Sequence, residues 1–412
     1  MRNRQAATVF IFVTLLLDIM GTGIVIPVLP QLIASFTEGD VSVASRYYGY
    51  FVATFAAMQF LFSPVLGALS DRYGRRSVLL ISLFGAGLDY LLMAIAPTLL
   101  LLFLGRVIAG ITAASFTVAS AYVADISPPE KRAQNFGVIG AAFGLGLIAG
   151  PVLGGLLGSF GPRVPFVVAS ALTLLNWLYG FFVLPESLAP HNRRAFGWRQ
   201  VNPVATLGAL RRYSGVLGLT TVVVSWNAAM QALVSTWVLS NSYRFSWSTG
   251  QQGVSLALFG LMFAVVQVGL LRFLIERLGE RRVLVLGLLN SVAGFVLYGA
   301  ATEGWMMYAI LVATALSAVT QPAAQGLISN GVPADEQGAI QGALVSLFSL
   351  AGIVSPLIAT MLFSYFTAPE RAAKVPGAPF FFGAAVTFLA LALALGMFAR
   401  ARAGRRATVI GS

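Results

Sequence analysis

The chain has no cysteine and a single histidine, His191, among its 412 residues. The absence of cysteine excludes disulfides, thiolate nucleophiles and cysteine-containing metal sites. One histidine in a polar segment cannot form a histidine cluster, so we expect no metal site. An enzyme would have only hydroxyl groups and aspartates for its chemistry. We therefore predict that the chain is not an enzyme and uses no cofactor.

Charge is also scarce, because Asp, Glu, Lys and Arg make up only 10% of the residues while hydrophobic residues make up 58%. A soluble domain carries about 25% charged residues. Continuous apolar runs of about 20 residues, the length that a transmembrane helix needs, recur along the chain and predict helices rather than a barrel. The first run is too long and too polar for a cleaved signal peptide, so we count it as a span. We predict twelve spans, at residues 7–35, 46–69, 77–96, 98–124, 134–160, 164–184, 214–241, 249–275, 282–301, 304–329, 337–366 and 378–399.

The positive charge is unevenly distributed between the loops. Of the 26 Lys and Arg residues, twenty fall in segments that lie inside when both termini are cytoplasmic, five fall outside, and Arg106 lies within a span. Cytoplasmic loops of membrane proteins carry such an excess of Lys and Arg. The net charge of +12 is therefore explained by the loops, and we expect no nucleic-acid partner.

Two halves of the chain form a repeat. A shift of 205 residues places residues 71–76 on 276–281, Pro128 on Pro333 and Pro151 on Pro356. Parallel repeats of six helices are a transporter architecture. The predicted fold is an all-α membrane protein with twelve transmembrane helices in two pseudo-symmetric six-helix bundles. We place the bundles at residues 1–184 and 214–400, a polar cytoplasmic linker at 185–213 and a cytoplasmic tail at 401–412.

A tight basic turn, residues 67–76 (GALSDRYGRR), joins the second and third predicted spans. Gly67 would permit a close helix contact, Asp71 would lie near the start of the next helix, and Gly74 would permit a strained backbone. An ordinary positively charged loop is the alternative, but the echo 205 residues later argues against it. The expected gating residues of this turn are Gly67, Asp71, Arg72, Gly74, Arg75 and Arg76.

At this turn the chain resembles the major facilitator superfamily, of which residues 67–76 match the signature loop. Residues 144–155 (GLGLIAGPVLGG) are similar to the antiporter motif of its drug exporters. The small residues of this motif would pack tightly against a neighbouring helix, and Gly150 and Pro151 would allow the helix to bend. The resemblance also implies that Asp125 and Arg132 take part in ion pairs that lock the inner face. The repeat equivalent of Asp125 is Asn330, so we expect such a latch in one half only.

The match extends to the tetracycline exporters of the drug/proton antiporter group. It rests on residues 18–30 (DIMGTGIVIPVLP), 88–90 (LDY), 105–112 (GRVIAGIT) and 124–126 (ADI), and more loosely on 244–247 (RFSW) and 336–342 (EQGAIQG). The chain departs from that family at two positions, where Ser291 replaces an aspartate and Phe263 replaces a histidine. Tetracycline stays the leading named candidate substrate, and multidrug export is the other form of this prediction.

Two acids, Asp18 and Asp89, lie within predicted spans. An acid in hydrocarbon is a functional candidate by default, and burial disfavours its charged form, as proton exchange requires. A structural acid paired with a buried base is the alternative, and Arg106 is the cation available within a span. Arg106 could equally be a partner of an acid or a substrate contact. We predict that Asp18 and Asp89 couple transport to protons and place Arg106 among the gating residues.

Polar and aromatic residues within the spans suit an amphipathic aromatic substrate, although packing explains each of them singly. The candidate substrate contacts are Gln59, Tyr90, Asn227, Gln231, Phe263, Gln267, Asn290 and Gln321. The sequence thus predicts a monomeric exporter of an amphipathic compound in the bacterial inner membrane, driven by the proton gradient through alternating access. The alternative is a proton symporter or a passive facilitator for a small metabolite. A receptor or scaffold would explain neither the acids nor the repeat.

Overall fold

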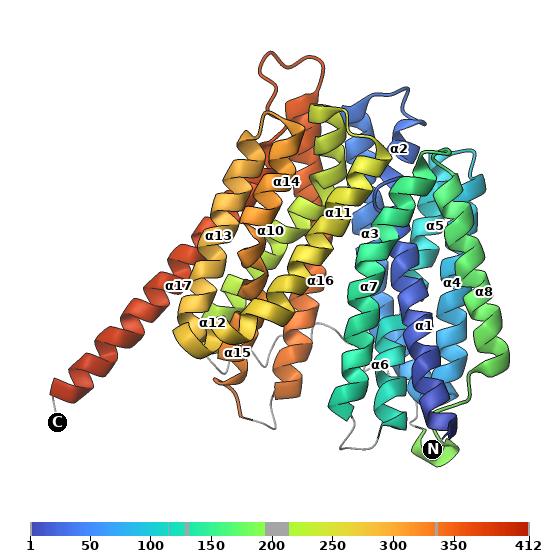
Figure 1. Ribbon diagram of the computed structural model, residues 1–412, viewed down its shortest axis with the longest axis horizontal. Helices are drawn as coiled ribbons and strands as arrows, with labels where there is room; N and C mark the ends of the chain where they lie inside the picture. Colours follow the sequence, from blue (N-terminus) through green and yellow to red (C-terminus); the bar gives the residue numbers. More distant parts are fainter. Residues whose placement is uncertain (1, 114, 128–131, 194–213, 334–336, 411–412) are drawn as a thin grey trace. The chain divides into compact units, whose positions relative to one another are not determined.

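The computed structural model describes residues 2–113, 115–127, 132–193, 214–333 and 337–410, and almost all of them are helical (Figure 1). Most of the predicted linker, residues 194–213, lies outside the described residues. The chain divides into two compact units. The first comprises Met1–Asn202 and Ser246–Gly260, and the second comprises Pro203–Phe245 and Leu261–Ser412. The fifteen residues Ser246–Gly260 thus group with the first unit although they follow the first helix of the second half.

The first unit is built on three helix pairs. Helix α1 packs along α7, α4 packs along α8, and α3 packs on α5, as Figure 1 also shows for α1 and α7. Its helices are α1 (Arg2–Val25), α2 (Leu29–Ala34), α3 (Val41–Tyr73), α4 (Arg75–Ile95), α5 (Leu99–Thr112), α6 (Ser115–Ile126), α7 (Arg132–Gly158) and α8 (Val164–Val183), followed by the short η2 (Pro190–Asn192).

The second unit centres on α10 and α13, which both pack on α17, while α10 also packs on α16. The elements of the second half are α10 (Ser214–Phe245), α11 (Thr249–Val265, of which the part up to Gly260 groups with the first unit), η4 (Val266–Leu270), α12 (Leu271–Leu278), α13 (Glu280–Ala300), α14 (Gly304–Ala313), η5 (Ala315–Val319), α15 (Thr320–Ser329), α16 (Gln337–Thr367) and α17 (Ala378–Ile410). Helix α17 continues through the predicted tail as far as Ile410.

Each of the twelve predicted spans coincides with a helix or a run of helices. Ten helices of the described residues are long and apolar enough to cross a membrane, and the bent pair Gly304–Ala313 and Ala315–Ser329 makes eleven. Helix α1, whose apolar part is Ile11–Val25, supplies the first predicted span. The chain is therefore a multi-pass membrane protein.

The bounds of the helices repeat with the offset seen in the sequence. Helix α4 spans Arg75–Ile95 and α13 spans Glu280–Ala300, so both ends are displaced by 205 residues. The starts of α5 and α14, and those of α7 and α16, are displaced by the same number. Local structure in the two halves therefore follows one pattern despite the different side chains.

In both units the span that follows α4 or its repeat equivalent α13 is interrupted. The first break separates α5 from α6 after Thr112, and the second replaces α-helix by the 3₁₀ segment η5 between α14 and α15, with a bend of 45°. Ala113 and Ala318 are equivalent in the repeat. The carbonyl oxygen of Ala113 accepts a hydrogen bond from Gln59 Nε2 at 3.3 Å, and that of Ala318 accepts one from Gln267 Nε2 at 3.0 Å. A backbone carbonyl freed within a membrane needs such a partner.

An arginine binds the carboxyl-terminal end of each repeated helix. Arg163 donates to the carbonyl oxygens of Ala94 at 2.8 Å and Ala96 at 2.7 Å, where α4 ends. Arg244 donates to the carbonyl oxygen of Tyr298 at 2.8 Å and also to that of Ala301, where α13 ends. A cation at a helix carboxyl terminus is favoured by the helix dipole and satisfies carbonyls that have no partner within the helix.

Candidate functional site

An ion pair is buried between α4 and α5 of the first unit. Arg106 Nη2 donates to Asp89 Oδ2, and the two side chains are 11% and 1% exposed. Asp89 Oδ1 and Arg106 Nε have no hydrogen-bond partner among the described residues. The structure therefore pairs Arg106 with an acid, one of the two possibilities that the sequence left open. The pair leaves part of the hydrogen-bonding capacity of both groups unused.

Small and aromatic side chains surround this pair. A Cβ added at Gly105 would lie 2.8 Å from Asp89 Oδ1, so the glycine allows the carboxylate to lie against α5. Arg106 Cζ lies 5.4 Å from the centroid of the Phe55 ring, a distance at which the ring face attracts a cation. The charge of Arg106 also acts on the hydroxyl of Tyr48, a buried residue of α3.

The second predicted acid, Asp18, is half-buried on α1, one turn before Thr22. Tyr90 follows Asp89 on α4, is 5% exposed, and places its hydroxyl 3.5 Å from Thr22 Oγ1. The negative charges of Asp18 and Asp89 both act on this hydroxyl. Tyr90, a candidate substrate contact from the sequence, is thus within the electrostatic reach of both acids.

The antiporter motif packs against the helix that carries Asp18. A Cβ added at Gly150 would lie 2.7 Å from the carbonyl oxygen of Met20 and 2.8 Å from Gly23 Cα. From the other side, a Cβ on Gly23 would lie 2.9 Å from Pro151 Cδ. The predicted tight packing of the small-residue face is confirmed, and its partner is α1.

The basic turn holds a network of charges around Arg75. Arg75 Nη1 lies 2.6 Å from Asp71 Oδ1 and donates to Ser70 Oγ at 2.6 Å, while Arg75 Nε lies 3.2 Å from Asp125 Oδ2 at the end of α6. Gly74 has φ = 103°, so the predicted strained backbone at this position is confirmed. The network ties the α3–α4 turn to α6.

The sequence missed Glu186, which follows α8. Its carboxylate accepts hydrogen bonds from the backbone N–H groups of Arg75 at 2.8 Å and Arg76 at 3.3 Å, the first two residues of α4. The predicted place of Asp71 at the start of that helix was wrong, because Asp71 lies in the last turn of α3. The anion at the amino terminus of α4 comes from a residue 111 positions away, which no local pattern indicates.

The equivalent position in the second unit carries a related contact. Glu280 begins α13 as Arg75 begins α4, and Asn330 Nδ2 donates to Glu280 Oε2 at 3.0 Å. Asn330 is the repeat equivalent of Asp125. The second half thus keeps a contact at this place, but between a carboxylate and a neutral amide, which agrees with the prediction of an ion-pair latch in one half only.

Four further residues of the predicted gating set are Gly67, Arg72, Arg76 and Arg132. A Cβ added at Gly67 would meet no described atom within 4 Å, so the close helix contact predicted there is not found. Arg72 Cζ lies 5.1 Å from the Tyr73 ring centroid, and Arg76 Nη2 donates to the carbonyl oxygen of Phe181 at 2.5 Å. Arg132 begins α7, and its side chain lies outside the described part of the structure.

The candidate substrate contacts fall in both units. Gln59 and Tyr90 belong to the first unit, and Gln59 and Gln267 both donate to carbonyls at helix breaks, as described above. Asn290 Nδ2 donates to the carbonyl oxygen of Ala313 at 3.4 Å. Half-buried side chains in the second unit are Asn227, Gln231, Gln267, Asn290 and Gln321, while Phe263 is 39% exposed. Their part in substrate binding stays a prediction.

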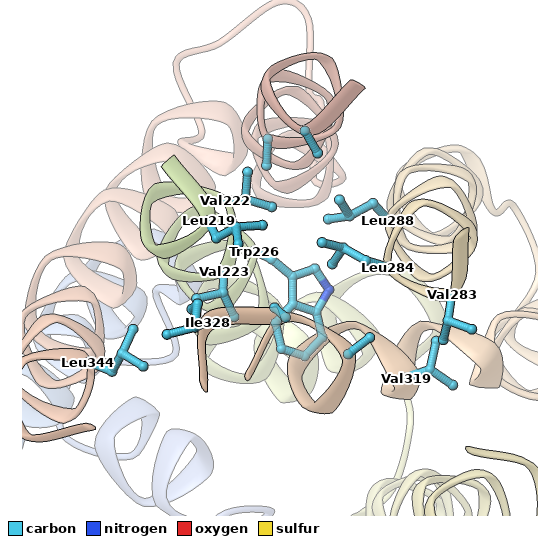
Figure 2. Close-up of a cluster of buried hydrophobic side chains, with 14 of the residues drawn as sticks. Leu219, Val222, Val223, Trp226, Val283, Leu284, Leu288, Val319, Ile328 and Leu344 are labelled. Atoms are coloured by element: carbon cyan, nitrogen blue, oxygen red, sulfur yellow. The ribbon is translucent and has the colours of Figure 1, made fainter. Parts of the chain in front are cut away.

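Trp226 of α10 lies within the apolar core of the second unit. Figure 2 shows its indole between Leu219, Val222 and Val223 of its own helix and Leu284 and Leu288 of α13. Its Nε1 donates to Ser291 Oγ at 2.9 Å, and the two residues are 4% and 3% exposed. Ser291 is thus the hydrogen-bond acceptor for a buried indole.

A family model described as Major Facilitator Superfamily matches residues 11–269 and 217–409 of the chain. The chain belongs to the major facilitator superfamily. It is 41% identical over 396 residues to the class C tetracycline resistance protein of Escherichia coli, covering 96% of this chain and 98% of that protein. It is 38% identical to the class D tetracycline resistance protein of Salmonella ordonez, covering 94% and 96%. The crystal structure of the human organic anion transporter MFSD10 (TETRAN) matches with a TM-score of 0.68 and 26% identity, covering 95% of this chain and 99% of that one.

Membership of the major facilitator superfamily confirms the resemblance drawn from the basic turn and the antiporter motif. It also confirms the fold class, an all-α membrane protein with twelve helices in two six-helix bundles. The domain boundaries predicted from the sequence stay a prediction, as do the roles assigned to the individual site residues.

Replacing Ser291 by alanine is expected to destabilise the protein, because Trp226 loses its hydrogen-bond acceptor. The variant leaves a buried indole N–H without its acceptor, which costs about 1–3 kcal/mol. Ser235 of α10 is the matched control, since it is 4% exposed against 3% for Ser291 but donates only to Ala232 of its own helix. Thermal unfolding of the purified protein, followed by tryptophan fluorescence, should show a lower midpoint for Ser291→Ala than for Ser235→Ala. Equal midpoints would contradict the prediction.

Replacing Glu186 by alanine is expected to loosen the start of α4. The carboxylate binds two of the amide groups that helix geometry leaves without partners, and its charge is favoured by the helix dipole. We expect a loss of about 1 kcal/mol in unfolding free energy. Glu276→Ala is the control, because its ion pair with Arg272 has side chains 60% and 89% exposed and contributes little. Thermal unfolding in detergent measures the stability of both variants. An equally large loss of stability in Glu276→Ala would contradict the prediction.

Proposed function

We propose that the chain is a proton-coupled exporter of tetracycline-like amphipathic compounds in the bacterial inner membrane, with both termini cytoplasmic. The substrate class is supported by the similarity to tetracycline resistance proteins over almost the whole chain. The observation that carries the coupling is the buried Asp89–Arg106 ion pair. In this proposal the chain is not an enzyme, acts as a monomer, needs no cofactor and draws its energy from the proton gradient.

Protonation of Asp89 is the proposed switch. Arginine stays charged in proteins, so a proton on Asp89 leaves a buried cation without its counter-charge. Removing one partner from a buried ion pair costs about 3–5 kcal/mol, which is comparable to the free energies that separate conformations. Arg106 would then be more stable in a conformation that gives it another partner or water. A drug that binds only one of the two conformations would be released when the proton binds.

The basic turn would hold one of these conformations. Arg75 joins α3, α4 and α6 through Asp71 and Asp125, and Glu186 adds the segment after α8. A movement of α5 around Arg106 would therefore require the contacts of Arg75 and Glu186 to rearrange. Gly150 and Pro151 would keep α1 and α7 together during the change, because their packing leaves no space for relative sliding.

Transport by purified protein in liposomes tests this proposal directly. Under a pH gradient, the parent chain should accumulate tetracycline and release protons in proportion to the drug that moves. Expression in a sensitive bacterium should raise resistance to tetracyclines. Resistance to lipophilic cations and to phenicols is measured in the same cells to test these two classes as alternative substrates. Drug transport without any proton movement would reject the coupling, and no resistance to any of the three classes would reject the export function.

A passive facilitator or a proton symporter for a small metabolite is the second candidate. It is favoured by Ser291, which stands where the tetracycline exporters have an aspartate. The hydroxyl of Ser291 accepts the hydrogen bond of Trp226 and cannot replace the carboxylate as a proton carrier. The acidic residues of the second half are Glu276, Glu280, Glu303, Asp335, Glu336 and Glu370, all outside the middle of its spans. A facilitator would equilibrate its substrate without moving protons, and a symporter would move protons in the same direction as the substrate.

A further inference from the structure

A polar stripe on α1 contains Asp18. Thr14, Asp18 and Thr22 are spaced by four residues and so lie on one face of the helix. Thr14 Oγ1 donates to Asn176 Oδ1 of α8 at 3.3 Å, and Asn176 Nδ2 donates to the carbonyl oxygen of Thr14 at 3.3 Å. One turn beyond Asp18, Thr22 Oγ1 lies 3.5 Å from Tyr90 Oη of α4. The acid therefore lies between two polar contacts that join α1 to its neighbours.

The hydroxyl of Tyr90 lies where α1, α4 and α8 meet. A Cβ added at Gly21 would lie 3.2 Å from Tyr90 Oη and 3.5 Å from Thr173 Oγ1 of α8. Thr173 is 1% exposed, and its hydroxyl has no hydrogen-bond partner within the described ranges. A phenol hydroxyl can donate one hydrogen bond and accept others, so it can exchange partners by rotation of its O–H bond.

Tyr90 and Asp89 are consecutive on α4, and consecutive side chains of a helix point in different directions. Asp89 faces Arg106 of α5, whereas Tyr90 faces Thr22 of α1. Helix α4 therefore connects the stripe of α1 to the buried ion pair. The charges that act on the Tyr90 hydroxyl are Asp18 from α1, Asp89 from α4 and Arg106 from α5.

The other described neighbours contribute no charge that acts on the Tyr90 hydroxyl. Helix α6, which packs on α1 and α4, carries Tyr122 and Asp125, and Asp125 pairs with Arg75 at the basic turn. Tyr48 of α3 is within the field of Arg106. In α8, the titratable side chain is Tyr179, which is 48% exposed, and the described side chains of α7 between 140 and 158 include no titratable group. The electrostatic surroundings of Tyr90 are therefore dominated by the two acids and the one arginine.

We propose that Tyr90 is the positioning residue through which the protonation state of Asp18 acts on the Asp89–Arg106 ion pair. When Asp18 is ionised, the phenol hydrogen is directed to its carboxylate. When Asp18 is neutral, the same hydroxyl bonds with Thr22. The phenol keeps its proton in both arrangements, and the change in its hydrogen bonding alters how α4, and with it Asp89, is held against α1. This inference rests on the proposed proton coupling.

The test compares Tyr90→Phe with Tyr298→Phe. Tyr298 of α13 is a matched control, since it is 7% exposed and its hydroxyl lies 3.4 Å from Thr314 Oγ1, also a threonine. Each variant loses one buried hydroxyl that contacts a threonine. The two sites differ because the charges of Asp18 and Asp89 act on the hydroxyl of Tyr90 and not on that of Tyr298. Liposomes containing each variant are assayed for tetracycline uptake under a pH gradient and for tetracycline exchange at equal pH, over mildly acidic to mildly alkaline buffers.

For Tyr90→Phe we expect gradient-driven uptake to fall about tenfold, the effect of about 1.4 kcal/mol, and to fall more than exchange does. The ionised form of Asp18 loses its donor, so the neutral form is favoured and the pH profile shifts to higher pH. Thr22→Val removes the partner used by the neutral form and should shift the profile to lower pH. Thr22 is exposed, so this second variant should fold even where Tyr90→Phe does not.

Tyr298→Phe should keep both the rate and the profile. A Tyr90→Phe variant with the parental pH profile would overturn the inference, whether its rate is unchanged or lowered equally in uptake and exchange, since a purely structural role predicts the latter. Shifts of the same sign in Tyr90→Phe and Thr22→Val would overturn it as well. If the parent itself shows exchange without gradient-driven uptake, the proposed coupling fails and this inference fails with it.

Discussion

Exchanging Asp89 for asparagine is expected to abolish proton-driven drug transport and to reduce resistance to the level of cells without the protein. The amide cannot take up a proton, so the switch is lost. It also leaves Arg106, which is 11% exposed, without its counter-charge. The loss of one partner of a buried ion pair costs about 3–5 kcal/mol. Resistance assays and liposome uptake measure the first effect, and thermal unfolding measures the second.

A double variant separates the two effects. Asp89→Asn with Arg106→Gln removes both charges, so it should recover much of the stability lost in Asp89→Asn alone. Transport should stay absent, because no group remains at this place that can bind and release a proton. Asp89→Glu, which keeps the charge, is the conservative control. Proton-coupled uptake at the parental rate in either Asp89→Asn variant would show that Asp89 has no part in coupling.

The second large effect is expected from Gly150→Val. The new Cβ would lie 2.7 Å from a carbonyl oxygen of α1 and 2.8 Å from Gly23 Cα, and both are backbone atoms that cannot turn away. Overpacking of a close interface costs about 1–3 kcal/mol, or more where the backbone must move. We therefore expect little folded protein in the membrane and a loss of resistance. Fluorescence-detected size-exclusion chromatography of a tagged chain measures the folded amount.

Gly144→Val is the control on the same helix and in the same motif. A Cβ added at Gly144 would meet no described atom within 4 Å, and the cost of valine in a helix is shared by both variants. This variant should retain most of the folded protein. If both variants give the same yield and the same unfolding midpoint, the contact between α1 and the antiporter motif is not what makes Gly150 necessary.

Much of the site was open to prediction because its residues break the rules of their surroundings. Asp18 and Asp89 stand out as acids in apolar runs, and Gly150 with Pro151 stands out as a small-residue motif. Their partners were not visible in the same way. The sequence allows two interpretations of Arg106, and the structure places it on Asp89. The sequence predicts Tyr90 as a substrate contact, and the structure adds that its hydroxyl lies beside Thr22.

The sequence by itself determined the class of the protein, the twelve spans and the repeat, because hydrophobic length and a constant offset are properties of the chain read in order. The tertiary structure decided which distant residues become partners, because sequence patterns hold no information on such contacts. It interrupted two spans at Ala113 and Ala318, where side-chain amides from other helices satisfy the freed carbonyls. It brought Glu186 to the start of α4 across 111 residues, and it left Ser291 as the acceptor of a buried indole. In each case a polar group lacks a partner in its own helix, and only packing brings one within reach.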